Sequence, residues 1–365
     1  MTIGVDATFI RSGAVGGAEQ MIRNLVTGLG ATGGGVTVFA RAGNWSDHIR
    51  GVELVEVPRR MNRFVASTYA AARFSDRHDV IYANYFVPPV VRRGHTVVAI
   101  INDAQYVHYP EFFSVAKRRW LRLAHRFSLK AAHRIVAISE FVREDLLAIY
   151  GDRWSDSIVT IPTPVSWDRL SPTKHLIKGP YILTVSAEYP HKNLTTLVKA
   201  FALARRRRDL DGVRLVIVGQ CAAKLVSTDD KGQLDRAIEE AGIAHDVLRL
   251  GYVRDEDVGA LYRDALAFVF PSLFEGFGMP AVEALGFGLP VITTRCAALP
   301  ETTLGFARYV KDPLDAEELA DTLVRVASCP AENRPSAEQV AAIRDAYNPV
   351  AVASRYRAMI GEVAL

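Results

Sequence analysis

Cysteine is scarce in this chain, and so are long apolar runs. The three cysteines among 365 residues, Cys221, Cys296 and Cys329, lie far apart and form no C-x-x-C pair. This argues against a disulfide-stabilised fold or a zinc ribbon and favours a reducing, cytoplasmic location. The first residues lack the basic start and cleavage site of a signal peptide, and no apolar run is long enough to span a bilayer.

Strong charge imbalance is also missing. The formal net charge of +4 permits an anionic ligand or an anionic membrane surface but requires neither. No G-x-G-x-x-G motif follows the first apolar run with an acid about twenty residues on. This absence argues against an NAD-dependent reductase, although the chain otherwise has the pattern of dinucleotide-binding folds.

What the chain does contain is a repeated alternation of apolar runs and amphipathic stretches. Expected strands cover 2–8, 35–40, 79–83, 96–101 and 134–139, then 181–186, 213–219, 247–251, 266–272 and 289–294. Helical patterns such as 17–30 and 114–132 lie between them. The alternation predicts an α/β protein with two doubly wound, Rossmann-like parallel sheets. We expect domains at 1–165 and 180–347, separated by a polar linker at 166–179.

The stretch "FEGFGMPAVEALGFGLPVI" follows one of these strands and carries two carboxylates, Glu275 and Glu283. Glycines at 276 and 278 allow close backbone approach, and Pro280 suits the first position of a helix that ends near Gly288. The start of such a helix offers free N–H groups to a phosphate. The structural alternative is that Glu283 only favours the helix dipole and that the turn binds nothing.

The same stretch, extended to "FPSLFEGFGMPAVEALGFGLPVITT", resembles the E-x7-E signature of the family-4 retaining glycosyltransferases. Further resemblance lies in "LGYVRDEDVGALYRDALAFVFPS", "YILTVSAEYPHKNLTTLVKAFALA", "INDAQYVHYPEFF" and "IVAISEFVREDLLAIYG", of which the last two resemble a mannosyltransferase-like branch. The resemblance implies the GT-B fold, in which two Rossmann-like domains face across a cleft. It also implies that the final helix, within 348–365, returns to the first domain.

The resemblance implies roles for several residues. Glu283 would hold the ribose hydroxyls of a nucleotide sugar, and Glu275 would contact the transferred sugar. Backbone N–H groups near Phe277, Gly278 and Met279 would assist. Lys192 would compensate the charge that grows on the leaving diphosphate; the alternative is an ordinary surface lysine.

Two further regions would complete the donor site. Gly16 and Gly17 precede a helical pattern, so their amides could meet the diphosphate, unless they are a simple helix start. Val253 follows a strand and could line the base pocket.

The chain departs from the family pattern at two points. His191 stands where relatives often have an arginine, and its reference pKa of about 6.5 makes it a poor substitute at neutral pH. Asn102 replaces a frequent histidine; it cannot take a proton, but its amide can bind a sugar hydroxyl. Asp103 could orient the acceptor, or it could simply cap a turn.

Two charged runs have simple structural explanations. The acids at 255–257 imitate a D-x-D metal motif but precede a helical pattern, so we expect an N-cap and first helical turn and no essential metal. The arginines at 205–208 suit a helix end. No accompanying pattern supports nucleic-acid binding.

The stretch at 117–134 is strongly basic, has no acid and contains interleaved apolar residues. It could lie on an anionic membrane, or it could be a core-packed helix with a basic face. We therefore expect a metal-independent, retaining hexosyltransferase with no cofactor. Its donor would be a nucleotide-diphosphate sugar, with GDP-mannose favoured, and its acceptor a glycan or a lipid-linked glycan. The alternative is a catalytically weak or inactive glycosyltransferase-like partner protein.

Overall fold

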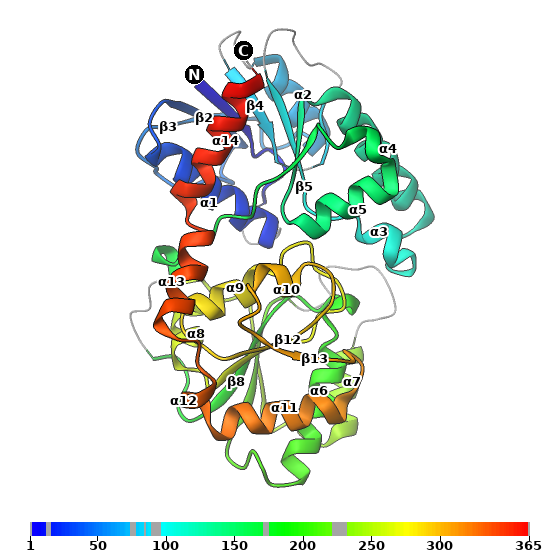
Figure 1. Cartoon of the computed structure of the whole chain (residues 1–365), viewed down its shortest axis with the longest axis vertical. Helices are drawn as coiled ribbons and strands as arrows, with labels where there is room; N and C mark the ends of the chain where they lie inside the picture. The colour runs from blue at the N-terminus through cyan, green and yellow to red at the C-terminus, as the bar shows by residue number, and fades with distance from the viewer. Residues whose placement is uncertain are drawn as a thin grey trace. The chain divides into compact units, whose positions relative to one another are not determined.

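The computed structural model describes residues 2–11, 16–73, 78–83, 85–88, 96–170, 175–220 and 232–363. The chain divides into two compact units (Figure 1). The first unit comprises residues 1–165 together with 346–365, and the second comprises 166–345. The return of the C-terminal segment to the first unit agrees with the expectation from the sequence.

The first unit contains a seven-stranded sheet whose paired strands are all parallel, in the order β3-β2-β1-β4-β5-β6-β7. The strands are β1 (Thr2–Asp6), β2 (Gly35–Arg41), β3 (Val52–Val57), β4 (His78–Tyr82), β5 (Val97–Ile101), β6 (Arg134–Ala137) and β7 (Ile158–Thr160). The order runs outward in both directions from β1 and β4. Ligands of such sheets bind beyond the carboxyl ends of the strands at this switch point.

Helices cover this sheet, and two of them come from opposite ends of the chain. The helices are α1 (Gly17–Ala31), α2 (Arg63–Arg73), α3 (Gln105–His108), α4 (Val115–Ala131), α5 (Glu140–Tyr150) and α14 (Pro349–Val363), with short 3₁₀ turns at Pro110–Phe112 and Asp152–Trp154. α14 packs against α1 (Figure 1). The approach is so close that a Cβ on Gly28 would lie 2.0 Å from the Pro349 carbonyl oxygen.

The second unit contains a six-stranded parallel sheet in the order β10-β9-β8-β11-β12-β13. Its strands are β8 (Tyr181–Val185), β9 (Arg214–Val218), β10 (Val247–Gly251), β11 (Ala267–Phe270), β12 (Val291–Thr294) and β13 (Arg308–Val310). β8 and β11 are neighbours at the switch point of this sheet, so the loops after them emerge side by side.

The helices of the second unit enclose a core on the sheet. They are α6 (Leu194–Arg206), α7 (Gln233–Ala241), α8 (Asp255–Asp264), α9 (Met279–Gly286), α10 (Leu299–Thr302), α11 (Ala316–Ser328), α12 (Pro330–Asn333) and α13 (Ala337–Ala346), with 3₁₀ turns η3 (Asp168–Leu170) and η4 (Pro190–Lys192). α6 packs against α11 and α7. Fully buried Leu197, Phe201 and Leu323 lie in this core.

The segment expected to link the domains belongs in part to the second unit. Trp167 is 9% exposed, and its indole N–H donates to the Glu283 carbonyl at 3.2 Å. A Cβ on Gly286 would lie 2.0 Å from the same indole nitrogen. The sequence of 166–170 is polar in composition, but it is anchored by one tryptophan and by the η3 turn against α8.

Candidate active site

Lys192 and Glu275 meet at the carboxyl edge of the second sheet. Lys192 ends η4 after β8, and Glu275 lies in the loop between β11 and α9. The Lys192 ammonium lies 2.5 Å from Glu275 Oε1, and the two side chains are 16% and 12% exposed. The ammonium also lies 5.0 Å from the centroid of the Phe270 ring. A paired, mostly buried lysine at this position differs from an ordinary surface lysine.

Ser272 organises this pair, and the sequence analysis did not single it out. Its hydroxyl, with the residue fully buried, lies 2.6 Å from Glu275 Oε1 and 3.1 Å from the His191 carbonyl. The backbone N–H of Leu273 also donates to that carbonyl at 2.7 Å. The two loops are thus joined just beside Lys192. The "FPS" that precedes the carboxylates was the available signal.

His191 does not provide a second cation beside Lys192. Burial, with a smaller contribution from the adjacent Lys192, lowers the pKa of His191 to about 3. Its ring stacks against Tyr189 with centroids 5.6 Å apart. At neutral pH this histidine is therefore neutral, and Lys192 is the cation of the η4 turn.

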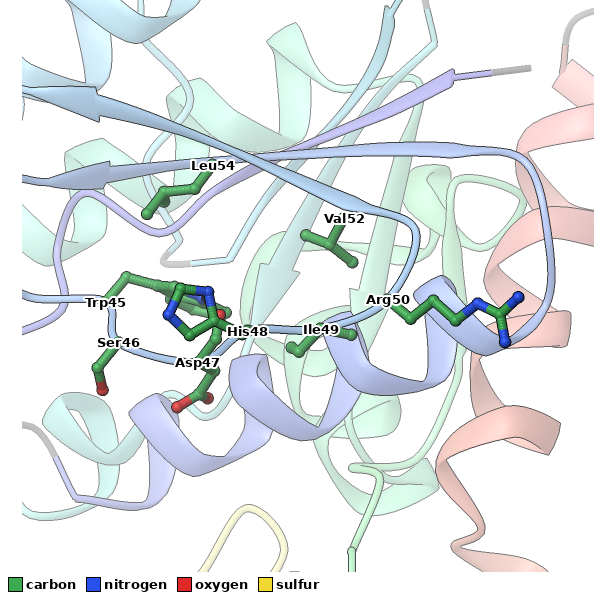
Figure 2. A pocket seen from close by; sticks show the side chains of 8 residues that line it. All are labelled: Trp45, Ser46, Asp47, His48, Ile49, Arg50, Val52 and Leu54. Atoms are coloured by element: carbon green, nitrogen blue, oxygen red, sulfur yellow. Dashed lines mark hydrogen bonds between the residues drawn. The ribbon is translucent and has the colours of Figure 1, made fainter.

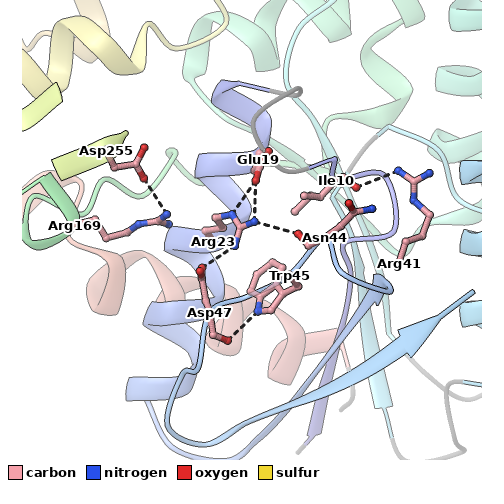
Figure 3. Close-up of polar contacts among 9 residues, drawn as sticks. All are labelled: Ile10, Glu19, Arg23, Arg41, Asn44, Trp45, Asp47, Arg169 and Asp255. Carbon is pink, nitrogen blue, oxygen red and sulfur yellow. Dashed lines mark hydrogen bonds and ion pairs between the residues drawn. The ribbon is translucent and has the colours of Figure 1, made fainter. Parts of the chain in front are cut away.

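Glu283 lies on α9 in a separate group of contacts. The Tyr262 hydroxyl donates to Glu283 Oε2 at 2.9 Å. Burial raises the pKa of Glu283 to about 7; the Tyr262 bond and Arg169 oppose this rise, and Asp255 adds to it. Arg169, from η3, forms an ion pair with Asp255 at 3.0 Å (Figure 3). Neither Tyr262 nor Arg169 was identified from the sequence.

One of the two glycines in the turn before α9 has a left-handed backbone. Gly278 precedes α9 with φ 83° and ψ 44°, and a Cβ there would lie 2.5 Å from the Leu299 side chain. Met279, rather than Pro280, is the first helical residue. The side chains of Phe277 and Met279 are buried, so only their backbone groups are left for the predicted ligand contacts. The Phe277 carbonyl accepts a hydrogen bond from the Thr302 hydroxyl at 2.6 Å.

The structure thus brings some predicted residues together and leaves others apart. Lys192 and Glu275 are in direct contact, whereas no hydrogen bond or ion pair in the described part of the chain joins Glu283 to either of them. Val253 is half-buried just after β10. The assignment of these residues to a nucleotide sugar remains a prediction.

In the first unit, Gly16 and Gly17 begin α1 beside a buried ionic network. Gly16 has φ 64°, and a Cβ on either glycine would meet nothing within 4 Å. Arg23 donates to Glu19 at 2.8 Å and forms an ion pair with Asp47 at 2.9 Å (Figure 3). Burial alone would lower the pKa of Arg23, but these two partners raise it. The network fixes the first turns of α1 to the segment after β2.

Asn102 and Asp103 follow β5, at the carboxyl edge of the first sheet. Asp103 Oδ1 accepts the backbone N–H of Gln105 at 3.0 Å, which is the structural role weighed for it above. Asn102 Oδ1 is buried and has no hydrogen-bond partner among the described residues. A buried acceptor without a donor is costly, so this oxygen is suited to receive a hydroxyl.

The two charged runs identified in the sequence lie at a helix start and in ion pairs. Asp255, Glu256 and Asp257 lie in the first turn of α8, but the N-cap residue is Arg254, so the expected acidic N-cap was wrong. Arg205 and Arg207 pair with acids of the second unit. Within the described ranges, no group of three or more His, Cys, Asp or Glu side chains is placed to hold a metal ion.

A further hollow, of about 440 Å³, lies beside β3 (Figure 2). Its lining consists of residues 45–50 with Val52 and Leu54, which form one continuous stretch of chain. Because no second element contributes to it and its only buried side chain is Trp45, it offers no convergent set of polar groups.

Comparison with known proteins agrees with this architecture. Residues 15–169 match the model of Glycosyltransferase Family 4, and residues 170–342 match that of Glycosyl transferases group 1. The O-antigen chain mannosyltransferase B of Escherichia coli is 29% identical over 261 residues, which are 67% of this chain and 64% of that relative. The chain thus spans less than two thirds of that relative's length.

Solved structures show the same fold. A sucrose-phosphate synthase from Thermosynechococcus elongatus has a TM-score of 0.79 at 18% identity and covers 100% of this chain and 99% of its own. HepE from Anabaena, in complex with UDP and glucose, has a TM-score of 0.72 at 16% identity, covering 99% and 100%. The two units therefore have the GT-B fold, and the chain belongs to the family-4, group 1 glycosyltransferases.

Proposed function

We propose that this protein is a retaining glycosyltransferase that moves a hexose, with mannose favoured, from a nucleotide-diphosphate sugar to an acceptor hydroxyl. The observation that carries the proposal is the contact among Lys192, Glu275 and Ser272 at the carboxyl edge of β8 and β11. A fixed ammonium there suits a leaving diphosphate, and the carboxylate suits the hydroxyls of the sugar.

The proposed reaction needs little proton chemistry from the protein. The bond from the anomeric carbon to the diphosphate oxygen breaks, and the acceptor oxygen forms a new bond on the same face. The acceptor proton passes to the leaving phosphate oxygen. Lys192 stabilises the negative charge that develops on the diphosphate, and Asn102 Oδ1 accepts a hydrogen bond from a bound hydroxyl. Glu283 holds the ribose.

Substitution of the paired residues tests the proposal. We expect Lys192→Ala to reduce transfer about 10²- to 10³-fold, the typical loss when one preorganised electrostatic group is removed. Lys199→Ala is the matched control, because Lys199 is an exposed lysine on α6. Unchanged turnover in Lys192→Ala would contradict the assignment.

The donor is tested by binding. The relative from Escherichia coli is named as a mannosyltransferase, which supports mannose as the transferred sugar. We propose GDP as the nucleotide of the donor. A thermal-shift panel with GDP, UDP, ADP, dTDP and their sugars would identify the donor, since a ligand at 100 times its Kd adds about 2.7 kcal/mol to stability. We expect activity to survive EDTA, because the proposed chemistry uses no metal and no cofactor.

A second candidate is a catalytically weak or inactive partner protein. The neutral His191 and the replacement of a frequent histidine by Asn102 favour it. It predicts nucleotide-sugar binding without hydrolysis or transfer to any acceptor. Single-turnover assays with purified protein and labelled donor distinguish the two candidates.

We also propose that α4 contacts an anionic membrane surface. Leu123 is 63% exposed and Phe127 is 39% exposed, and Arg119, Arg126 and Lys130 are exposed on the same helix. No helix in the described segments is both long and apolar enough to cross a bilayer. Co-sedimentation with phosphatidylglycerol vesicles, compared with phosphatidylcholine vesicles, tests this contact. Leu123→Gln with Phe127→Gln should abolish it.

A further inference from the structure

Three arginines of the first unit lie near the segment that follows β1; Arg41 is buried, Arg63 is half-buried and Arg11 is exposed. Arg11 comes directly after Ile10. Arg41 ends β2, and its Nη2 donates to the Ile10 carbonyl at 3.0 Å (Figure 3). Arg63 begins α2 and lines a small cavity together with Thr8 and Phe9. All three therefore lie at the carboxyl edge of a parallel sheet, where such folds bind ligands.

Arg41 is buried with only part of its guanidinium satisfied by the Ile10 carbonyl. It is 5% exposed, and its Nε has no hydrogen-bond partner among the described residues. No ion pair with an acid of the described chain is found for Arg11, Arg41 or Arg63. Burial lowers the pKa of Arg41, and the charges of Arg11 and Arg63 lower it further. An unpaired buried cation beside like charges is unfavourable unless an anion joins it.

Asp6 lines the same cavity but does not serve as that anion. Its carboxylate accepts the backbone N–H of Thr8 at 2.9 Å and the hydroxyl of Ser67. Burial raises the pKa of Asp6, whereas the hydrogen bonds from Ser67 and Thr8 oppose this rise. Asp6 forms no ion pair with an arginine in the described ranges, so the three guanidinium groups are not in direct contact with this carboxylate.

Arg63 has polar and aromatic partners. Arg63 Nη2 donates to the Tyr85 hydroxyl at 2.8 Å, and its guanidinium lies 4.5 Å from the centroid of the Phe64 ring. Tyr85 itself has φ 30°, a strained backbone of a kind that clusters at functional sites. The Phe64 ring also contacts Phe86 at 5.0 Å and Trp120 at 5.1 Å. Cations and aromatic faces thus lie together.

We infer that Arg11, Arg41 and Arg63 form a phosphate subsite, which in the proposed function receives a phosphate group of the acceptor. This inference rests on the proposed function for the identity of the occupant. Guanidinium groups bind phosphate oxygens through paired N–H donors, and burial strengthens such bonds. The neighbouring rings of Phe64 and Phe86 would cover the adjoining apolar or sugar part of the acceptor.

Titration with inorganic phosphate tests the subsite directly. We expect Arg11→Gln and Arg63→Gln each to weaken phosphate binding about tenfold, which corresponds to the loss of one charge-assisted hydrogen bond. Arg41→Lys keeps the charge but loses the fork, and should weaken binding while leaving the protein folded. Arg60→Gln, an exposed arginine of the same region, is the matched control. Equal binding by the cluster variants and the wild type would overturn the inference.

Two further arms separate the possible sources of the phosphate and the possible failures. Mannose 1-phosphate represents a soluble acceptor, and phosphatidylcholine vesicles with phosphatidic acid represent a lipid headgroup. The ligand whose binding is weakened by Arg63→Gln identifies the source of the phosphate. If Arg63→Gln weakens the binding of neither ligand, the subsite does not serve the acceptor. Failure of the proposed function would appear separately, as wild-type protein that binds no nucleotide. Lys192→Ala should leave phosphate binding at this cluster unchanged.

Discussion

The burial of Glu283 opposes the ribose-binding role that we propose for it. A carboxyl group accepts hydrogen bonds from two ribose hydroxyls best when it is ionised, yet burial raises the pKa of Glu283 to about 7. The Tyr262 hydroxyl counteracts this effect by donating to the ionised form. Donor binding should therefore be sensitive to pH near neutrality.

We predict that donor affinity rises as pH increases through about 7, because Glu283 then loses its proton. Tyr262→Phe removes a bond to the ionised carboxylate, so the pKa of Glu283 should increase and the transition should move to higher pH. Glu283→Gln should bind weakly at all pH values, without the transition. Isothermal titration of nucleotide between about pH 6 and pH 8 measures these profiles.

Protein stability should show the opposite dependence. The folded pKa of Glu283 is raised above its unfolded value of 4.5, so its contribution is complete below pH 4.5 and is lost as pH rises through about 7. The difference in melting temperature between Glu283→Gln and the wild type should follow this change. A constant difference over that range would argue against the raised pKa.

At the scale of residues, the sequence predicted which side chains belong to the candidate site better than it predicted their surroundings. The E-x7-E spacing and "EYPHKN" identified Glu275 and Lys192, and the structure places them in contact. The neutral state of His191 depends on its burial in the folded protein. Ser272 and Tyr262 act on the candidate residues through tertiary contacts, which no local pattern contains.

At the scale of elements, the start of α1 depends on a buried ion network. Arg23 is 4% exposed and Glu19 is 6% exposed. We predict that Arg23→Ala reduces the free energy of unfolding by about 3–5 kcal/mol, because Glu19 would remain as a buried, unpaired charge. Urea denaturation measures the change. Arg119→Ala, an exposed arginine on α4, should change it by less than about 0.5 kcal/mol.

The contact of η3 and Trp167 with α9 is also testable through one glycine. We predict that Gly286→Ala destabilises the protein by about 1–3 kcal/mol, since its Cβ would lie 2.0 Å from the Trp167 indole nitrogen. Gly361→Ala, in α14 with no atom within 4 Å of the added Cβ, should be neutral or slightly stabilising. Thermal unfolding compares them. Similar melting temperatures for both variants would show that Trp167 is free to move.

The element pattern was predictable where strands are buried and less so at an edge. The central strands read as continuous apolar runs, as buried parallel strands do. β3 was missed because it is an edge strand in which Glu53 and Glu56 are exposed, so its sequence, "VELVEV", lacks such a run. The linker was overextended because a single tryptophan anchors an otherwise polar segment.

At the scale of the whole molecule, the first unit is discontinuous in sequence. Its core is completed by α14, whose buried residues include Val352, Tyr356, Met359 and Ile360. Each large apolar side chain contributes roughly 1.5–3 kcal/mol when buried. Their sum is comparable to the whole stability of a domain, about 5–15 kcal/mol.

We therefore predict that a chain ending at residue 345 loses the fold of the first unit but keeps that of the second, which is continuous over 166–345. Circular dichroism melting and limited proteolysis should show a protected fragment that begins near residue 166. A chain ending at Val363 is the control and should melt like the full chain. If the shortened chain protected residues 1–165 equally well, α14 would be an attachment to the first unit and not a part of its core.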